Sequence, residues 1–214
     1  MPRLAYGWEL SAGRTVSPGL IREFIRPAVR AIPPRMAVAL GPCRIALLEG
    51  LGRPTVASQW AEVSRGLEIA LATAQRREHD IALELLLCLG QALWSRLEES
   101  RRAAYWRLLD GEIGAGTDGE IDQDALQHKR RLLSSRYSAA SSRRLASYGA
   151  ASFAGTAAEY VHCLWHEVTV RTGRDFLPAR ELRRRLDLLS GWYPPGRGRR
   201  LFALPRRRPP PGAA

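Results

Sequence analysis

The sequence predicts an α+β fold, in which a small N-terminal sheet packs against a mostly helical C-terminal part. The sheet is expected at residues 43–73, where Leu67, Ile69 and Leu71 alternate with residues that would face the opposite side, as in a half-buried strand. Residues 78–98 are apolar on most faces, which is typical of a central helix. These two patterns place the sheet before the main helices.

Ahead of the sheet, residues 19–31 carry apolar side chains at spacings of three and four, which predicts a helix. Pro27 lacks a backbone N–H and its ring collides with the preceding turn, so this helix should be kinked or divided there. The strands follow, separated by turns rich in glycine and proline. The expected strands are 43–49, 56–63 and 67–73.

Helices make up most of the remaining chain. Asp122 stands in front of residues 123–135, where its carboxylate can cap the first turn of a helix. Thr156 and Glu159 match a capping box, which predicts that a separate helix begins after residue 156. Pro178 suits the start of the last helix. The expected helices after the sheet are 78–98, 101–113, 123–135, 139–148, 157–172 and 178–190.

A chain of 214 residues, 45% of them apolar, is long enough for one domain with a full core. Residues 1–17 are punctuated by glycine and serine, and we expect them to be loose. Residues 18–193 should form the single domain. Residues 194–214 are a tail rich in proline and arginine, which we expect to be disordered beyond about residue 204.

The formal net charge of +12 suggests nucleic acid or an acidic protein as a partner, because clustered cations release counterions from phosphates. Of the 33 basic residues all but one are arginines, and six lie in the last 18 residues; without these six the net charge is +6. Aromatic residues are not interleaved with the basic ones, as a stacking platform requires. Nucleic acid therefore stays an alternative that composition does not favour. It would act through the tail and through Arg180, Arg183, Arg184 and Arg185 of the last helix.

Three scattered cysteines, Cys43, Cys88 and Cys163, argue against a disulfide framework and favour a reducing compartment. Their apolar surroundings predict inert thiols. The longest apolar run, residues 85–89, is far shorter than the roughly 20 residues that span a bilayer, and the N-terminus has no apolar signal segment. We therefore expect a cytoplasmic protein with no membrane partner.

Residues 159–166 bring a carboxylate and two imidazoles onto one helical face. Glu159, His162 and His166 fall within an arc of roughly 60°. Two imidazoles four residues apart can hold one transition-metal ion, with the carboxylate as a third ligand. The alternative is that Glu159 closes the capping box and both histidines lie on a solvated or hydrogen-bonded face.

The expected central helix also carries a polar stripe. Asp80, Glu84 and Gln91 share one face of it. Because buried polar groups are almost always paired, this stripe needs partners, and we expect arginines of a neighbouring helix to supply them.

Residues 87–94 read Leu-Cys-Leu-Gly-Gln-Ala-Leu-Trp, followed by Tyr-Trp at 105–106 and Ala-Ala-Glu-Tyr at 157–160. This layout resembles the HExxH zinc metallopeptidases with a glutamate as third ligand (zincins), whose central helix reads His-Glu-Leu-Gly-His-Ala-Leu. The resemblance implies a short sheet, a central helix and a later helix that carries the glutamate ligand. It requires residues 87–91 to lie beside residues 159–166 across a shared cleft.

The resemblance covers residues 43 to about 193. The packing residues of the motif are retained, but its metal ligands on the central helix and its general base are replaced. Leu87 and Gln91 stand where the two histidine ligands belong, Cys88 replaces the general-base glutamate, and Glu159 matches the third ligand. Without the two imidazoles the usual zinc site does not form, and without the carboxylate no base takes a proton from metal-bound water.

Three functions follow as hypotheses. The first is a catalytically degenerate, metallopeptidase-like binding or scaffold module for a protein or peptide partner, with no cofactor and no activity. The second is a zinc-dependent hydrolase with displaced ligands Glu159, His162 and His166, and with His79 added from the central helix; it predicts about one zinc ion per chain, removed by His166→Ala. The third is the arginine-rich nucleic-acid or acidic-partner binding protein.

Overall fold

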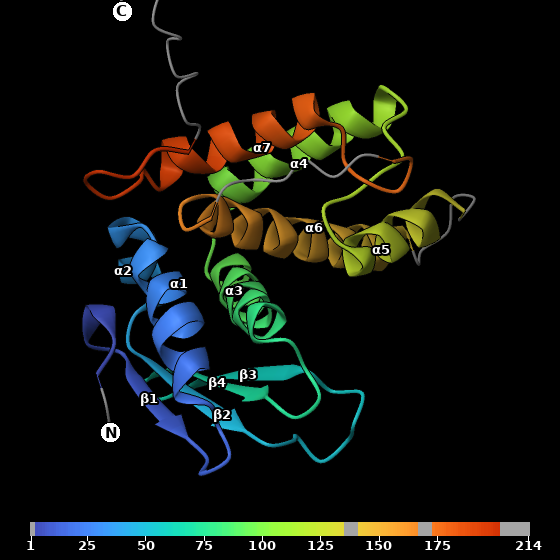
Figure 1. Cartoon of the computed structure of the whole chain (residues 1–214). Helices are drawn as coiled ribbons and strands as arrows, with labels where there is room; N and C mark the ends of the chain where they lie inside the picture. Colours follow the sequence, from blue (N-terminus) through green and yellow to red (C-terminus); the bar gives the residue numbers. More distant parts are fainter. Residues whose placement is uncertain (1–2, 135–140, 167–172, 202–214) are drawn as a thin grey trace, which may run out of the picture.

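The computed structural model of the chain describes residues 3–134, 141–166 and 173–201. Within them it contains a four-stranded sheet and seven α-helices, with 56% of residues helical and 14% in strands (Figure 1). The predicted α+β class, a small sheet followed by a helical part, is confirmed. None of the helices in these ranges is both long and apolar enough to cross a bilayer.

The sheet has the strand order β1-β2-β4-β3. The first three strands in this order run parallel, and the last forms an antiparallel edge. The strands are β1 (Glu9–Ala12), β2 (Cys43–Leu48), β3 (Ser58–Val63) and β4 (Gly66–Ala72). All three predicted strands are present within two residues of the predicted bounds.

Strand β1 lies inside the segment expected to be loose, residues 1–17, so that expectation was wrong. Leu10 of β1 pairs with Ile45 of β2 and is completely buried. Trp8 is also buried and donates a hydrogen bond from Nε1 to the Gly41 carbonyl oxygen, at 3.0 Å. A four-residue strand shows no periodicity, and its partner lies more than thirty residues away, so only tertiary pairing reveals it.

Helices cover one face of the sheet, and the other face is open among the described residues (Figure 1). Alternate side chains of β2 and β4 are buried against the helices, as the alternation at Leu67, Ile69 and Leu71 predicts. On the open face Arg44 of β2 contacts Glu68 and Glu9, at 3.3 Å each.

The chain between β1 and β2 forms a π-helical segment, η2 (Leu20–Ile25), then α1 (Arg26–Ala31) and α2 (Pro34–Leu40). The hydrogen bonding changes from π-helical to α-helical at Arg26, one residue before Pro27, but the backbone stays helical there, so the predicted kink or division is not seen. The sequence analysis did not predict α2, which has Pro34 at its first position.

The helical part stacks outward from the sheet. Its helices are α3 (Glu78–Ser95), α4 (Glu99–Gly114), α5 (Gln123–Leu133), α6 (Ser141–Cys163) and α7 (Ala179–Trp192). Helix α3 lies on the sheet, α6 crosses α3 on the side away from the sheet, and α4 and α7 lie beyond α6 (Figure 1). At the crossing a Cβ atom on Gly90 would lie 2.7 Å from the carbonyl oxygen of Ala154, so the two backbones meet there.

Helix α6 is one continuous helix, although the sequence predicted two, at 139–148 and 157–172. The predicted capping box was wrong: Thr156 lies in mid-helix and donates from Oγ1 to the Ser152 carbonyl oxygen at 2.8 Å. The small residues before it permit close packing and do not end the helix; a side chain on Gly149 would collide with the ring of Trp106. Residues 167–172 lie outside the described ranges.

The structure confirms the starts predicted for the helices that follow Asp122 and Pro178. Asp122 accepts a hydrogen bond from the Ala125 N–H at 2.9 Å, and Pro178 precedes α7. The first part of the tail packs onto the domain, since Arg199 donates from Nη1 to the Leu164 carbonyl oxygen at 2.6 Å. Residues 202–214, which include the stretch expected to be disordered, lie outside the described ranges.

Candidate functional site

A cleft between α3 and α6 contains a cavity of about 130 Å³. The loop before α5 and the start of α7 close it on the outside. It therefore holds two of the three positions that the resemblance assigns to metal ligands, Leu87 on α3 and Glu159 on α6, and these two face the same space. From the two helices it is lined by Leu83, Leu87, Gly155, Ala158 and Glu159.

Cys88 and Gln91, the other replaced residues of the motif on α3, make structural contacts outside the cavity. Cys88 is 2% exposed, and burial raises the pKa of its thiol to about 11, so the thiol stays protonated near neutral pH. Gln91 does not line the cavity; its Oε1 accepts a hydrogen bond from Trp60 Nε1 on β3, at 2.7 Å. Neither residue serves as a base or a metal ligand in the cleft.

Two residues of the polar stripe of α3, Glu84 and Gln91, find partners on the edge strand. The third, Asp80, lies 3.8 Å from His79 of the same helix. The expected arginines of a neighbouring helix do not supply these contacts, so that expectation was wrong. Ser58 of β3 donates to Glu84 Oε2 at 2.7 Å, and Trp60 of β3 donates to Gln91. The antiparallel edge strand runs beside α3, which the helical pattern by itself does not show.

Asp122 supplies an unusual group at the cavity wall. Its Oδ1 caps α5, whereas its Oδ2 is buried and has no hydrogen-bond partner among the described residues. Gly155 makes room for this oxygen, because a Cβ atom there would collide with it. Burial raises the pKa of the Asp122 carboxyl above its ordinary value. With Glu120 and Glu159, three acidic residues thus line this mostly apolar cavity.

Three of the four histidines of the chain gather beside this cleft. His79, in the first turn of α3, approaches His162 near the end of α6, with 3.1 Å between the two Nε2 atoms. The ring centre of His166 lies 5.6 Å from that of His162 and 5.7 Å from that of His79. The structure therefore brings together the two predicted histidines and the one that the hydrolase hypothesis added from the central helix.

The carboxylate of Glu159 lies beside Nδ1 of His162, whereas His79 approaches the Nε2 atom of the same ring. Oε2 of Glu159 lies 3.5 Å from Nδ1 of His162, and its Oε1 accepts from the Cys163 thiol at 3.7 Å. The predicted ligand set Glu159, His162 and His166 is thus not assembled around one point. Within the described ranges, no group of three or more His, Cys, Asp or Glu side chains stands ready-made as a metal site.

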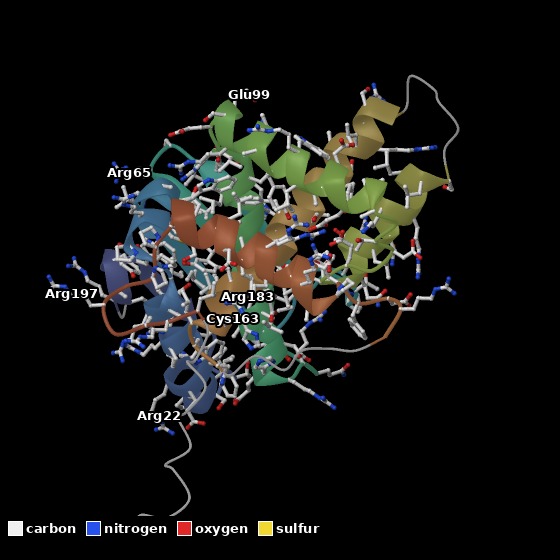
Figure 2. The ribbon with its side chains drawn as sticks, turned by 90° about the horizontal axis from the view of Figure 1, so that it is seen from above. Arg22, Arg65, Glu99, Cys163, Arg183 and Arg197 are labelled. Carbon is white, nitrogen blue, oxygen red and sulfur yellow. The ribbon has the colours of Figure 1, made fainter. Side chains whose placement is uncertain are left out.

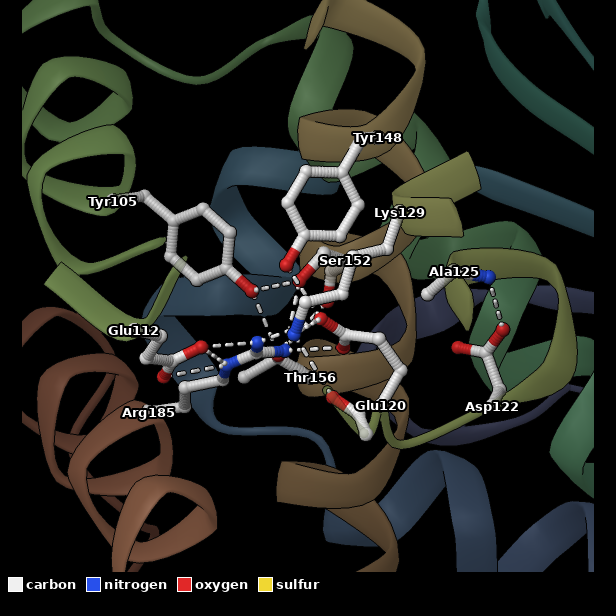
Figure 3. Close-up of polar contacts among 11 residues, drawn as sticks. Tyr105, Glu112, Glu120, Asp122, Ala125, Lys129, Tyr148, Ser152, Thr156 and Arg185 are labelled. Atoms are coloured by element: carbon white, nitrogen blue, oxygen red, sulfur yellow. Dashed lines mark hydrogen bonds and ion pairs between the residues drawn. The ribbon is translucent and has the colours of Figure 1, made fainter. Parts of the chain in front are cut away.

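A buried charge network, which the sequence analysis missed, joins the outer helices (Figure 3). Arg185 of α7 is completely buried between Glu112 of α4 and Glu120, which precedes α5. It donates from Nε to Glu112 at 3.0 Å, and from Nη1 to Glu120 at 2.7 Å and to Ser152 of α6 at 2.8 Å. A fully buried guanidinium that pairs with two carboxylates has a structural role, because removing it would leave buried charges without a partner.

Lys129, the only lysine of the chain, completes this network from α5. It donates from Nζ to the Gly119 carbonyl oxygen at 3.0 Å, and Tyr148 donates its hydroxyl to Glu120. Burial opposes ionisation of Glu120, but Arg185, Lys129 and the Tyr148 hydroxyl together outweigh it and hold the pKa of Glu120 below its ordinary value. Two cations thus balance two carboxylates inside the protein.

The network corrects the nucleic-acid hypothesis in one respect. Arg185 was named as a contact residue, but it has no exposed surface; Arg180, Arg183 and Arg184 are exposed. A sequence signal existed, since Leu182, Arg185, Leu186 and Leu189 share one apolar stripe of the helix.

Arginines elsewhere are dispersed over the surface. Figure 2 shows Arg22, Arg65 and Arg197 at separate points of the outline, whereas Arg183 lies on the face turned to the viewer. A nucleic-acid footprint needs the cations on one face or along one stripe. The distribution of these labelled residues does not form one.

The candidate functional features of this chain are the cleft, the histidine cluster and the charge network. No protein-family model, curated protein or solved structure matches this chain. Its function has to be argued from the residues themselves.

Proposed function

We propose that this chain is a catalytically inactive, metallopeptidase-like binding module, whose cleft between α3 and α6 receives one side chain of a protein partner. The observation that carries the proposal is the cavity shared by Leu87 and Glu159. Two of the three positions to which the resemblance assigns metal ligands line it, yet its α3 wall is made of Leu83 and Leu87, which offer no ligand.

The replacement of the general-base glutamate of the motif by Cys88 supports the inactive state. Hydrolysis by this class of enzyme needs a carboxylate that takes a proton from water. Cys88 holds that position and is buried with a raised pKa, and the open cleft faces an apolar side chain at Leu87. The three free cysteines are buried, which supports a reducing, cytoplasmic location.

The size and chemistry of the cavity favour a basic side chain as its occupant. Ligand sites for whole cofactors or drug-sized molecules occupy roughly 300–1,000 Å³, and this cavity is smaller. Its apolar wall suits the stem of a lysine. The unpartnered Oδ2 of Asp122 and the carboxylate of Glu159 suit an ammonium group at the end of that stem.

Binding can be tested with two matched peptides, Ac-Gly-Lys-Gly-NH2 and the same peptide with norleucine in place of lysine. We expect the lysine peptide to shift the amide NMR signals of Gly155 and Ala158, with a Kd on the order of 1 mM. The norleucine peptide should bind at least about tenfold more weakly, because it lacks the charge-assisted hydrogen bond. Equal binding of the two peptides, or binding of neither, contradicts the proposal.

Two variants separate the cleft from general surface charge. Asp122→Asn keeps the helix cap but loses the charge, and it should weaken lysine binding about tenfold or more. Asp124→Asn, at an exposed carboxylate outside the cavity, should leave the Kd unchanged. In a parallel assay the full chain with added Zn²⁺ should not cleave denatured casein; cleavage that disappears in Glu159→Ala would establish an enzyme instead.

A further inference from the structure

We propose that His79, His162 and His166 bind one Zn²⁺ ion where the N-terminal end of α3 meets the C-terminal end of α6. This site is separate from the cavity of the cleft, which none of the three histidines lines. It also differs from the ligand set expected from the sequence, because His79 takes the place of Glu159.

The distances between the rings suit a shared ion. Zinc–nitrogen bonds of 2.0–2.1 Å in a tetrahedral site place two ligand nitrogens about 3.3 Å apart, and their ring centres about 5 Å apart. The Nε2 atoms of His79 and His162 are 3.1 Å apart, and their ring centres are 5.2 Å apart. The ring of His166 is only slightly more distant from both, at 5.7 and 5.6 Å.

The proton positions also favour a cation between the rings. If two neutral rings simply hydrogen-bond, one of them carries its proton on Nε2 and turns a bare Nδ1 outward. Both Nδ1 atoms, however, face carboxylates: that of His162 lies 3.5 Å from Glu159, and that of His79 lies 3.8 Å from Asp80. With a metal bound, both Nδ1 atoms are protonated towards a carboxylate and both Nε2 lone pairs point at the ion.

Glu159 then acts as the partner that orients His162. Nδ1 of His162 is buried and makes no hydrogen bond to any residue that the structure describes, so a small movement of the carboxylate from 3.5 Å completes the contact. Histidine ligands of zinc regularly donate their second nitrogen to a carboxylate in this way. The charge of Glu159 offsets part of the charge of the bound ion.

Aromatic side chains pack around the imidazoles and restrict their orientation. Trp165 stacks on His79 with ring centres 6.2 Å apart and packs against His166 at 4.2 Å. His166 lies just beyond the C-terminal end of α6, three residues after Cys163. Its ring is exposed and has to turn to bring a nitrogen to the ion, since the three side chains do not form a finished site as they stand.

The test is a titration of the full chain, stripped of metal with EDTA, with Zn²⁺ followed by calorimetry and with Co²⁺ followed by visible absorption. We expect one ion per chain, a tetrahedral Co²⁺ spectrum, and a rise in Tm on adding Zn²⁺. His79→Ala should raise the Kd for Zn²⁺ at least about 100-fold, because loss of a mere orienting group already costs 10–100-fold.

His128→Ala provides the matched control, because it removes the one histidine that lies outside the cluster. It should leave the stoichiometry and Kd unchanged, and the metal-free Tm of both variants should match that of the parent chain. Absence of one-to-one binding, unchanged affinity in His79→Ala, or an equal loss in His128→Ala overturns the proposal. Lysine-peptide binding in the cleft is measured without metal, so either proposal can fail alone.

Discussion

Replacing Arg185 with alanine should lower the free energy of unfolding by about 3–5 kcal/mol. The side chain is completely buried, and its removal leaves the carboxylates of Glu112 and Glu120 without their guanidinium partner. Lys129 reaches Glu120 at 3.4 Å and cannot replace the contacts to Glu112. Urea denaturation at pH 7, followed by circular dichroism, measures the change.

Arg184→Ala is the natural control, because this neighbouring arginine is exposed on the same helix. Its expected effect is within about 0.5 kcal/mol, as for most surface substitutions. Arg185→Lys should fall between the two, since an ammonium keeps the charge but not the five donors of the planar fork. A loss of less than about 1 kcal/mol in Arg185→Ala would show that the network does not have this structural role.

Gly90→Val should destabilise the protein by about 3 kcal/mol, which is the upper part of the range for overpacked positions. A Cβ atom at residue 90 meets the carbonyl oxygen and the Cα atom of Ala154 at 2.7 and 2.8 Å, and both belong to backbone. Helices α3 and α6 therefore have to move apart. Because this crossing positions Leu87 opposite Glu159, the same variant should also lose binding of the lysine peptide.

Gly111→Val tests whether valine on a helix explains the loss by itself. Gly111 lies in α4 with nothing within 4 Å of the added Cβ, so we expect no loss of stability there. Thermal unfolding of both variants gives the comparison. Similar Tm values for the two would contradict close contact of α3 and α6 at Gly90.

Local patterns predicted most of the elements. The alternation in β4 and the length of the apolar run in α3 depend on residues that are neighbours in the chain, so their periods are visible without a structure. The same local reasoning misplaced the start of the helix at Thr156. Its hydroxyl bonds a carbonyl within α6 and meets Tyr105 of α4 at 2.8 Å, so the residue that looks like a cap is a packing contact.

The candidate site was predicted only in part. Glu159, His162 and His166 were found because one helical face carries all three, and Leu87 and Glu159 were paired through the resemblance. Three features of the site depend on how α3, α5 and α6 are packed, and the sequence does not show them. They are the contact of Glu159 with His162, the unpartnered oxygen of Asp122 and the approach of His79 to His162.

The linear order of residues was enough to predict an α+β chain with a central apolar helix. Composition and spacing carry that information, because hydrophobic burial follows the period of each element. Packing alone decided that Arg185 pairs with Glu112 and that His79 approaches His162. Both results depend on contacts between residues more than 70 positions apart, which no local pattern encodes.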